Sequence, residues 1–211
     1  MKSPDELLKK FQARSLEILN RLDEFKGIMK DSDERIFEEL AFCLCTPQSK
    51  ATVCWNAVTA LVKNDLLFTG SKEKIRPFLN AVRFGDNKSG YIVEARQLFP
   101  EMQIKQKILS MPNPVELREW LAENVKGLGL KEASHFIRNI GLSDNKVAIL
   151  DRHILKNLVE YGVIAGIPKN LSEKTYLEIE QKMKDFAGEL GITLDELDLL
   201  LWSEETGVVF K

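Results

Sequence analysis

The chain has 211 residues, which suits one large domain or two small ones, and its 44% apolar content is ordinary for a globular protein. Its net charge of −2 argues against a surface coated with positive charge for nucleic acid, although local charge matters more than the sum. The three cysteines form no CxxC pair and the two histidines lie far apart, so we expect no metal site and no iron–sulfur cluster.

The compartment is indicated by the cysteines and by the start of the chain. Cys43, Cys45 and Cys54 lie in apolar helical context, which favours reduced core thiols in a cytosolic protein. The stretch Met1–Glu6 is not a signal peptide, and no apolar run approaches membrane length. We therefore expect a cytoplasmic monomer that is not bound to a membrane.

The first half of the chain has the pattern of several helices. A capping serine, a proline at the first helical position and two acids predict a helix start at Ser3–Glu6. Asp31–Asp33 opens the next helix, and Thr46–Ser49 interrupts it. Arg83–Lys88 has the composition of a loop. Apolar residues at helical spacing recur at 36–44, 53–62, 75–82 and 91–98.

The second half continues in the same way. Asn113-Pro114 starts a helix that runs to Val125, and the helix from Leu130 ends at Gly141. Further helices are predicted at 151–161, at 172–190 and from the capping box at Thr193–Glu196. The one weak alternating pattern, at Gly207–Phe210, would allow a short terminal strand.

These patterns predict an all-α protein of about ten helices with short connections. So many helices in this length favour two small helical lobes that share a cleft. We place a middle domain at residues 32–144. A second domain would combine residues 1–31 and 145–211.

The turn Lys126-Gly127-Leu128-Gly129 resembles a helix-hairpin-helix element. Backbone amides at such a turn and at the following helix start can bind a phosphate oxygen without reading sequence, often with help from a monovalent cation. A tight corner between two helices would also need glycine. Basic residues favour the DNA reading, since they gather near the turn at Lys126, Lys131, Arg138, Arg152 and Lys156.

Lys131 and Asp151 form the pair most suited to chemistry. A lysine amine is a nucleophile when neutral, and burial at a helix start near other cations lowers its pKa. A neighbouring carboxylate can accept its proton or stabilise a developing cation. The alternative reading is a surface lysine and a helix-capping aspartate, which are the commonest fates of these residue types.

The stretch 125–155 is similar to the helix-hairpin-helix–GPD superfamily of DNA glycosylases. Within that superfamily it resembles the archaeal-type, second class of 8-oxoguanine DNA glycosylase/AP lyases, and the similarity extends over nearly the whole chain. It is carried by Lys126–Gly141, by Ala148–Leu155, by Phe42–Gln48, by Arg83-Phe84 and by the chain ending. The segment Gly85–Gly90 is less basic than is usual in that class.

The resemblance implies a fold and a mechanism. The fold is that of a DNA glycosylase, and the partner is double-stranded DNA containing 8-oxoguanine, in the cytoplasm at the nucleoid. Lys131 would attack the sugar C1′ and displace the base, with Asp151 stabilising the cationic state. The resulting Schiff base would allow β-elimination, and no cofactor would be required.

The resemblance also implies roles for further side chains. Phe84 and Trp202 match positions that sandwich the extruded base, where core packing is the alternative. Gln48 resembles the side chain that fills the gap in the duplex, and otherwise it is a surface amide. Lys211 matches a terminal lysine that distinguishes the oxidised base from guanine, whereas by position alone it would be disordered.

Several basic side chains keep two readings each. His135 and His153 would lie near the DNA backbone or orient site residues, or else be satisfied buried histidines. Arg138 and Arg152 would contact phosphates or form ion pairs. Together with Lys126, Gly127 and Gly129, we place Arg152 and Gln48 in the DNA-binding set.

Two other functions fit the same sequence. One is a related glycosylase that acts on another oxidised base or on adenine opposite the lesion. The other is a non-catalytic helix-hairpin-helix module that binds DNA without forming a covalent adduct.

Overall fold

The computed structural model describes residues 2–211, so Met1, the first residue of the predicted second domain, lies outside it. The described residues form helices and no strand, which confirms the all-α prediction and corrects the strand pattern at Gly207–Phe210. In chain order the helices are α1 (Pro4–Ile28), α2 (Asp33–Cys45), α3 (Ala51–Lys63), α4 (Leu66–Thr69), α5 (Lys72–Ile75), η1 (Arg76–Leu79), α6 (Gly85–Gln97), η2 (Pro100–Met102), α7 (Ile104–Leu109), α8 (Pro114–Asn124), α9 (Leu130–Asn139), α10 (Arg152–Glu160), α11 (Glu173–Leu190) and α12 (Leu194–Thr206).

Short polar side chains begin several of these helices as predicted. The Ser32 hydroxyl accepts a hydrogen bond from the Arg35 amide at 3.3 Å and so caps α2. At α12 the predicted capping box is present. The Thr193 hydroxyl accepts from the Glu196 amide at 3.3 Å, and the Thr193 amide donates to the Glu196 carboxylate at 2.6 Å.

Two predictions between residues 75 and 88 were wrong in detail. The pattern at 75–82 is not one helix, because Pro77 has no amide hydrogen to donate, and a 3₁₀ turn replaces the helix from Arg76. The predicted loop at Arg83–Lys88 is a turn only at Arg83 and Phe84, because Gly85 to Lys88 form the first turn of α6. A side chain at Gly85 would overlap the Leu79 carbonyl, so this position requires glycine.

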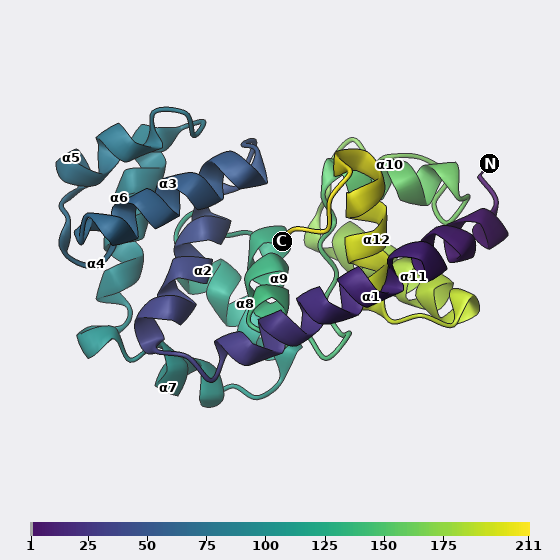
Figure 1. Cartoon of the computed structure of the whole chain (residues 1–211), viewed down its shortest axis with the longest axis horizontal. Coiled ribbons are helices and arrows are strands. Elements are labelled where there is room, and N and C mark those ends of the chain that lie inside the picture. The colour runs from purple at the N-terminus through teal and green to yellow at the C-terminus, as the bar shows by residue number, and fades with distance from the viewer. Residues whose placement is uncertain (1) are drawn as a thin grey trace.

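The buried apolar side chains form two clusters. The first runs from Ile28 to Val147, and the second combines residues of α1, such as Leu7 and Phe25, with residues from Ala148 to Val209. Figure 1 shows α2 to α9 on one side and α10 to α12 on the other, with α1 running along both and the C-terminus lying between them. The limits of the two domains, at 32–144 and at 1–31 plus 145–211, stay a prediction.

The two clusters meet at residues near the predicted site. Leu130, at the start of α9, packs against the second cluster. Conversely, Trp202 of α12 and Phe210 of the C-terminal tail pack against the first cluster. The junction therefore brings the start of α9 and the end of the chain into the same region. Within residues 2–211 the structure has no helix of the length and apolarity needed to cross a membrane.

Candidate active site

The hairpin between α8 and α9 is closed by its own backbone. The Leu128 amide donates to the Val125 carbonyl over 3.0 Å, which turns the chain within a few residues. Gly127 has φ +97°, and a side chain there would come within 2.9 Å of Cε2 of Tyr91. Both the backbone angle and the close ring therefore require glycine at this position.

Gly129 precedes α9 with an extended backbone, so it is needed less for its conformation than Gly127. Its amide donates to the Glu132 carboxylate over 3.3 Å. Glu132 thus occupies the helix start that we expected to receive a phosphate. A phosphate at this position has to displace that carboxylate.

Lys131 is the second residue of α9 and is about a quarter exposed, with 28% of its side chain accessible. Its ammonium lies 2.8 Å from the Glu132 carboxylate. The described residues contain no ion pair between Lys131 and Asp151. Glu132 therefore binds both the Gly129 amide and the ammonium of Lys131, the predicted nucleophile. This role of Glu132 was not predicted from the sequence.

Asp151 caps the start of α10, and three donors fix its carboxylate. Oδ1 accepts from the amides of His153 and Ile154, each at 2.8 Å. Oδ2 accepts from the indole Nε1 of Trp202 at 3.1 Å. The capping position was predicted, but the hydrogen bond that joins Asp151 to Trp202 was not.

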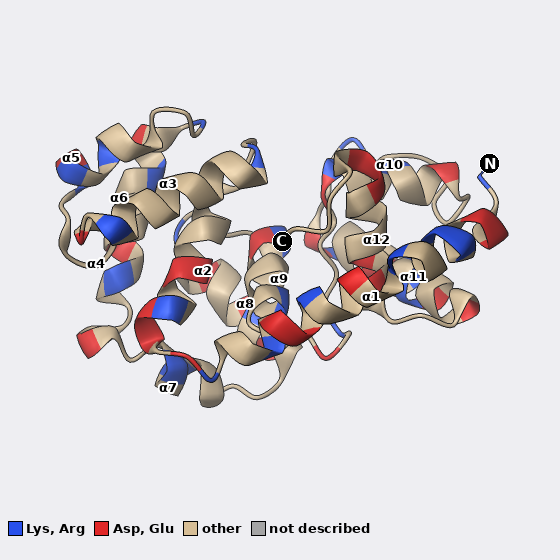
Figure 2. Ribbon diagram, in the orientation of Figure 1, with Lys and Arg blue, Asp and Glu red and all other residues tan. Residues whose placement is uncertain are grey.

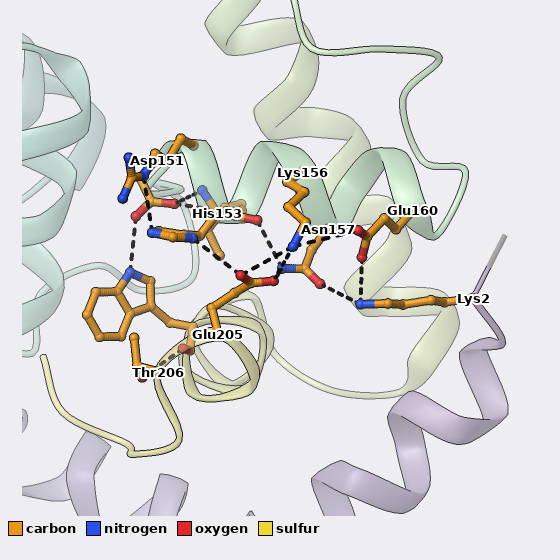
Figure 3. Close-up of polar contacts among 11 residues, drawn as sticks. Lys2, Asp151, His153, Lys156, Asn157, Glu160, Glu205 and Thr206 are labelled. Atoms are coloured by element: carbon orange, nitrogen blue, oxygen red, sulfur yellow. Dashed lines mark hydrogen bonds and ion pairs between the residues drawn. The ribbon is translucent and has the colours of Figure 1, made fainter.

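The polar face of α10 continues this arrangement (Figure 3). The imidazole Nδ1 of His153 lies 3.5 Å from the Glu205 carboxylate, which also receives the Lys156 ammonium at 3.1 Å. The Arg152 guanidinium, at the exposed start of the helix, donates to the other ring nitrogen of His153 over 3.2 Å. His153 thus links α10 to α12 and is not a buried core histidine.

Phe84 and Gln48 project from two turns of the first cluster. Phe84 has φ 58° and ψ 34°, and half of the residue (51%) is exposed, which rules out core packing for it. The Arg83 guanidinium lies 5.0 Å from the centre of its ring. Gln48, with φ 56°, is exposed in the turn between α2 and α3. Left-handed backbones at such residues are strained and are common at functional sites.

Trp202 and Lys211 lie deeper. Trp202 is half-buried at the junction of the clusters. Lys211 is buried, not disordered: its ammonium bonds the Glu39 carboxylate and lies 3.7 Å from the centre of the Trp55 ring. Burial lowers the pKa of Lys211, and the Glu39 charge opposes that shift. Glu39 was missed, although a buried acid between apolar residues of a helix is a recognisable signal.

His135 is buried beside the same tail. Its ring lies 5.5 Å from that of Phe42 in an edge-to-face arrangement, and its Nε2 has no hydrogen-bond partner within residues 2–211. Burial, together with the charges of Arg138, Lys131 and Lys211, lowers the pKa of His135 well below its ordinary value. His135 is therefore buried, as the alternative interpretation predicted, but its Nε2 is not satisfied.

The basic cluster expected around the hairpin is largely paired. Lys126 lies 3.1 Å from Glu94, and the buried Arg138 lies 3.3 Å from Asp198, so Arg138 forms an ion pair and does not face a phosphate. Figure 2 shows acidic and basic residues interspersed over both groups of helices. Lys126 and Arg152 remain exposed enough to meet a ligand.

Comparison with known proteins decides which family this arrangement belongs to. The model of the family described as 8-oxoguanine DNA glycosylase matches residues 18–192. A protein of Fusobacterium nucleatum subsp. nucleatum named 8-oxoguanine DNA glycosylase/AP lyase is 47% identical, covering 98% of this chain and 97% of the relative. The chain belongs to the 8-oxoguanine DNA glycosylase family.

Solved structures of this family have the same fold. The crystal structure of the Methanocaldococcus jannaschii 8-oxoguanine DNA glycosylase aligns with a TM-score of 0.89 at 37% identity, covering 99% of this chain and 95% of the other. The glycosylase/lyase of that organism in complex with a 15mer DNA containing 8-oxoguanine aligns at 0.88 and 38% identity, with 98% and 100% coverage. The resemblance and the helix-hairpin-helix fold predicted for this member of the family are confirmed.

Proposed function

We propose that this chain is a bifunctional DNA repair enzyme that excises 8-oxoguanine from double-stranded DNA and then nicks the strand. One observation carries the proposal. Lys131 follows directly on the hairpin of Gly127 and Gly129, at the junction where α12 fixes the carboxylate of Asp151. Membership of the 8-oxoguanine DNA glycosylase family over most of the chain supports it.

The glycosylase step uses the lysine as nucleophile. A neutral Lys131 Nζ forms a bond to C1′ while the bond from C1′ to the base breaks, and the departing base leaves with the bonding electrons and takes up a proton. The negative Asp151 stabilises the positive charge that builds on the sugar. Its three hydrogen bonds hold it in place, so it needs no rearrangement during the reaction.

The lyase step follows from the same bond. Ring opening gives a Schiff base between Lys131 and C1′, which acidifies the C2′ proton. Removal of that proton breaks the C3′–O bond and nicks the strand on the 3′ side. Water then hydrolyses the Schiff base and restores the amine. Lys131 first has to leave Glu132, which costs little because a partly exposed ion pair is weak.

The base itself is held by aromatic rings. Extrusion costs a few kcal/mol of unstacking, and stacking between two rings recovers part of it. Phe84 supplies an exposed ring, and the half-buried Trp202 supplies the second ring while its indole nitrogen donates to Asp151. Gln48 fills the gap in the duplex, and Lys211 reads the oxidised edge of the base from the end of the chain.

Contacts to the DNA backbone hold the strand during the reaction. Lys126 and Arg152 supply exposed positive charge, and the Gly129 amide of the hairpin would receive one phosphate once the Glu132 carboxylate is displaced. A monovalent cation would bind the hairpin through backbone carbonyls. No group of three or more His, Cys, Asp or Glu side chains within residues 2–211 is arranged to hold a metal ion. We further propose a monomer that works in the cytoplasm on nucleoid DNA.

A panel of duplexes tests the substrate. Each duplex carries one 8-oxoguanine, one thymine glycol, or one adenine opposite 8-oxoguanine, and strand cleavage is measured at equal enzyme concentration. We expect cleavage at 8-oxoguanine to be the fastest by at least about tenfold. Faster cleavage at thymine glycol, or removal of the adenine, would assign the chain to one of the related activities instead.

A further inference from the structure

Within residues 2–211, Lys88 is a buried lysine with no carboxylate partner. Only 3% of the residue is exposed, and its ammonium donates to the carbonyls of Cys45 and Pro47, each over 2.7 Å. The Ser49 hydroxyl lies 3.4 Å from the same nitrogen. Burial lowers the pKa of Lys88. Burying an ammonium costs free energy unless it is hydrogen-bonded. The three neutral acceptors therefore show which part of the protein Lys88 stabilises.

All three acceptors belong to the turn that presents Gln48. Cys45 ends α2, and Pro47 and Ser49 flank Gln48 on its two sides. The Ser49 amide closes the turn by donating to the Thr46 carbonyl over 3.0 Å. Gln48 has the strained left-handed backbone, which persists only where the surroundings enforce it. Lys88 supplies that constraint from behind the turn.

Lys88 and Ser49 also form hydrogen bonds to the turn that contains Phe84. The Ser49 hydroxyl accepts from the Arg83 amide over 2.9 Å, directly before Phe84. The amide of Lys88 donates to the Phe84 carbonyl over 3.0 Å and so closes the first turn of α6. The Gln48 turn and the Phe84 turn are therefore connected through one lysine and one serine, although more than thirty residues separate them in the sequence.

We infer that Lys88 is a positioning residue that fixes Gln48 and Phe84 as one rigid unit. Gln48, which fills the gap in the duplex, and Phe84, which stacks on the extruded base, then reach the DNA at a fixed distance and orientation to each other. The inference rests on the proposed function, because that function gives Gln48 and Phe84 their roles. Its structural part, the joining of two turns, can be measured without any substrate.

The first test measures the turns in the free protein. Lys88→Met keeps a buried stem of similar length and removes the three donors. Amide hydrogen exchange should then speed up by about tenfold or more at residues 46, 48–50 and 83–85 while α8 and α9 keep their protection. Lys72→Met is the matched control, since Lys72 is an exposed lysine of α5 that pairs with Asp86 at 2.9 Å. Unchanged exchange in Lys88→Met, or equal loosening in the control, would overturn the inference.

A milder variant keeps the test decisive if Lys88→Met fails to fold. Ser49→Ala leaves both carbonyl bonds of Lys88 in place and removes the acceptor for the Arg83 amide. We expect faster exchange at 83–85 with little change at 46–48. Faster exchange at neither turn would show that Ser49 does not connect them.

The second test measures what the rigid unit does in the reaction. Single-turnover excision of 8-oxoguanine from duplex DNA should slow by about 10- to 100-fold in Lys88→Met, since small misplacements have costs of that size. Borohydride trapping on DNA with a preformed abasic site, where no base has to be extruded and stacked, should change by less than about threefold. An equal loss in both assays would mean general damage to the protein and would overturn the positioning role.

A double-mutant cycle connects Lys88 to Gln48. Gln48→Ala alone should slow excision. Lys88→Met should then slow excision much less in the Gln48→Ala protein than it does in the parent, because the effects of coupled residues are not additive. Independent, multiplying losses would contradict the inference. Failure of the proposed function is distinguishable, because the parent protein itself would then neither excise 8-oxoguanine nor be trapped.

Discussion

The indole nitrogen of Trp202 donates to the Asp151 carboxylate over 3.1 Å, so the last helix fixes the acid that begins α10. In the proposed mechanism, this bond would join the ring that stacks on the base to the charge that stabilises the sugar. Trp202 also packs on the first hydrophobic cluster, although α12 belongs to the second. A single side chain therefore connects Asp151 with the junction of the two clusters, and in the proposed mechanism it would also bind the base.

Trp202→Phe separates stacking from positioning, because it keeps an aromatic ring and removes the donor. A hydrogen bond to a charged group contributes about 1.5–3 kcal/mol, so single-turnover excision should fall by about 10- to 100-fold. Trp120→Phe in α8, which packs on the first cluster beside Lys107, is the control and should change the rate little. A Trp202→Phe enzyme as fast as the parent would mean that the bond to Asp151 has no catalytic role.

Gly127→Ala tests the hairpin. The residue has φ +97°, and a methyl group would press on the Tyr91 ring. We expect a loss of about 1–3 kcal/mol or more in the free energy of unfolding, measured with urea, together with weaker binding to DNA. Gly188→Ala in α11 meets nothing within 4 Å and should stabilise the protein by up to about 1 kcal/mol. Equal stability of the Gly127→Ala variant and the parent would show that the turn tolerates side chains.

The sequence predicted most helices and capping residues well because these depend on neighbours along the chain, although the side chain of Ser3, the predicted cap of α1, makes no capping hydrogen bond. Ser32, Asp151 and Thr193 each cap a helix within three residues of their own position. The break at Arg76 was not predicted, because the apolar residues at 75–82 keep helical spacing on both sides of Pro77. The start of α6 at Gly85 was missed because a polar, glycine-containing stretch has no apolar period to detect.

The helix positions of the predicted catalytic pair agree with the sequence, the partners of the two side chains were not predicted, and the catalytic roles stay a prediction. Lys131 and Asp151 stand at helix starts as expected. The partner of Lys131 is the adjacent Glu132, and the indole bond to Asp151 comes from a residue fifty-one positions away. Lys88 has no recognisable motif, because its partners lie in segments that only folding brings together.

Removal of the Lys211 ammonium tests the role of the chain end in stability. Lys211→Met leaves Glu39 buried with Arg35, at 2.7 Å, as its remaining cation. Breaking a buried pair is strongly destabilising, and with Arg35 still present we expect about 2–4 kcal/mol by urea unfolding. The double variant with Glu39→Gln should recover part of that loss. A cost below about 0.5 kcal/mol would mean that Lys211 is not held as the structure shows.

His135 should make stability depend on pH. Its pKa in the folded protein is held well below the value of the unfolded chain by burial and then by Arg138, Lys131 and Lys211. The folded state therefore binds the proton less well. The contribution of the neutral ring is fully present above the unfolded pKa of about 6.5 and is lost as the pH falls toward the folded pKa.

His135→Leu should remove that dependence. Relative to the parent, its free energy of unfolding should improve as the pH falls from neutral to acidic, by up to about 1.4 kcal/mol per pH unit. Unfolding by urea at several pH values measures the difference between the two proteins. A difference that stays constant across the range would contradict the lowered pKa.

The central claim is that Lys131 forms a covalent bond to the sugar of the damaged nucleotide. Borohydride reduction during reaction with a duplex containing 8-oxoguanine tests it directly, with the adduct resolved by denaturing electrophoresis. The parent and Lys146→Gln, which alters an exposed lysine paired with Asp144, should both be trapped, whereas Lys131→Gln should give no adduct. Trapping of Lys131→Gln as efficient as that of the parent, or no trapping of the parent, would contradict the account.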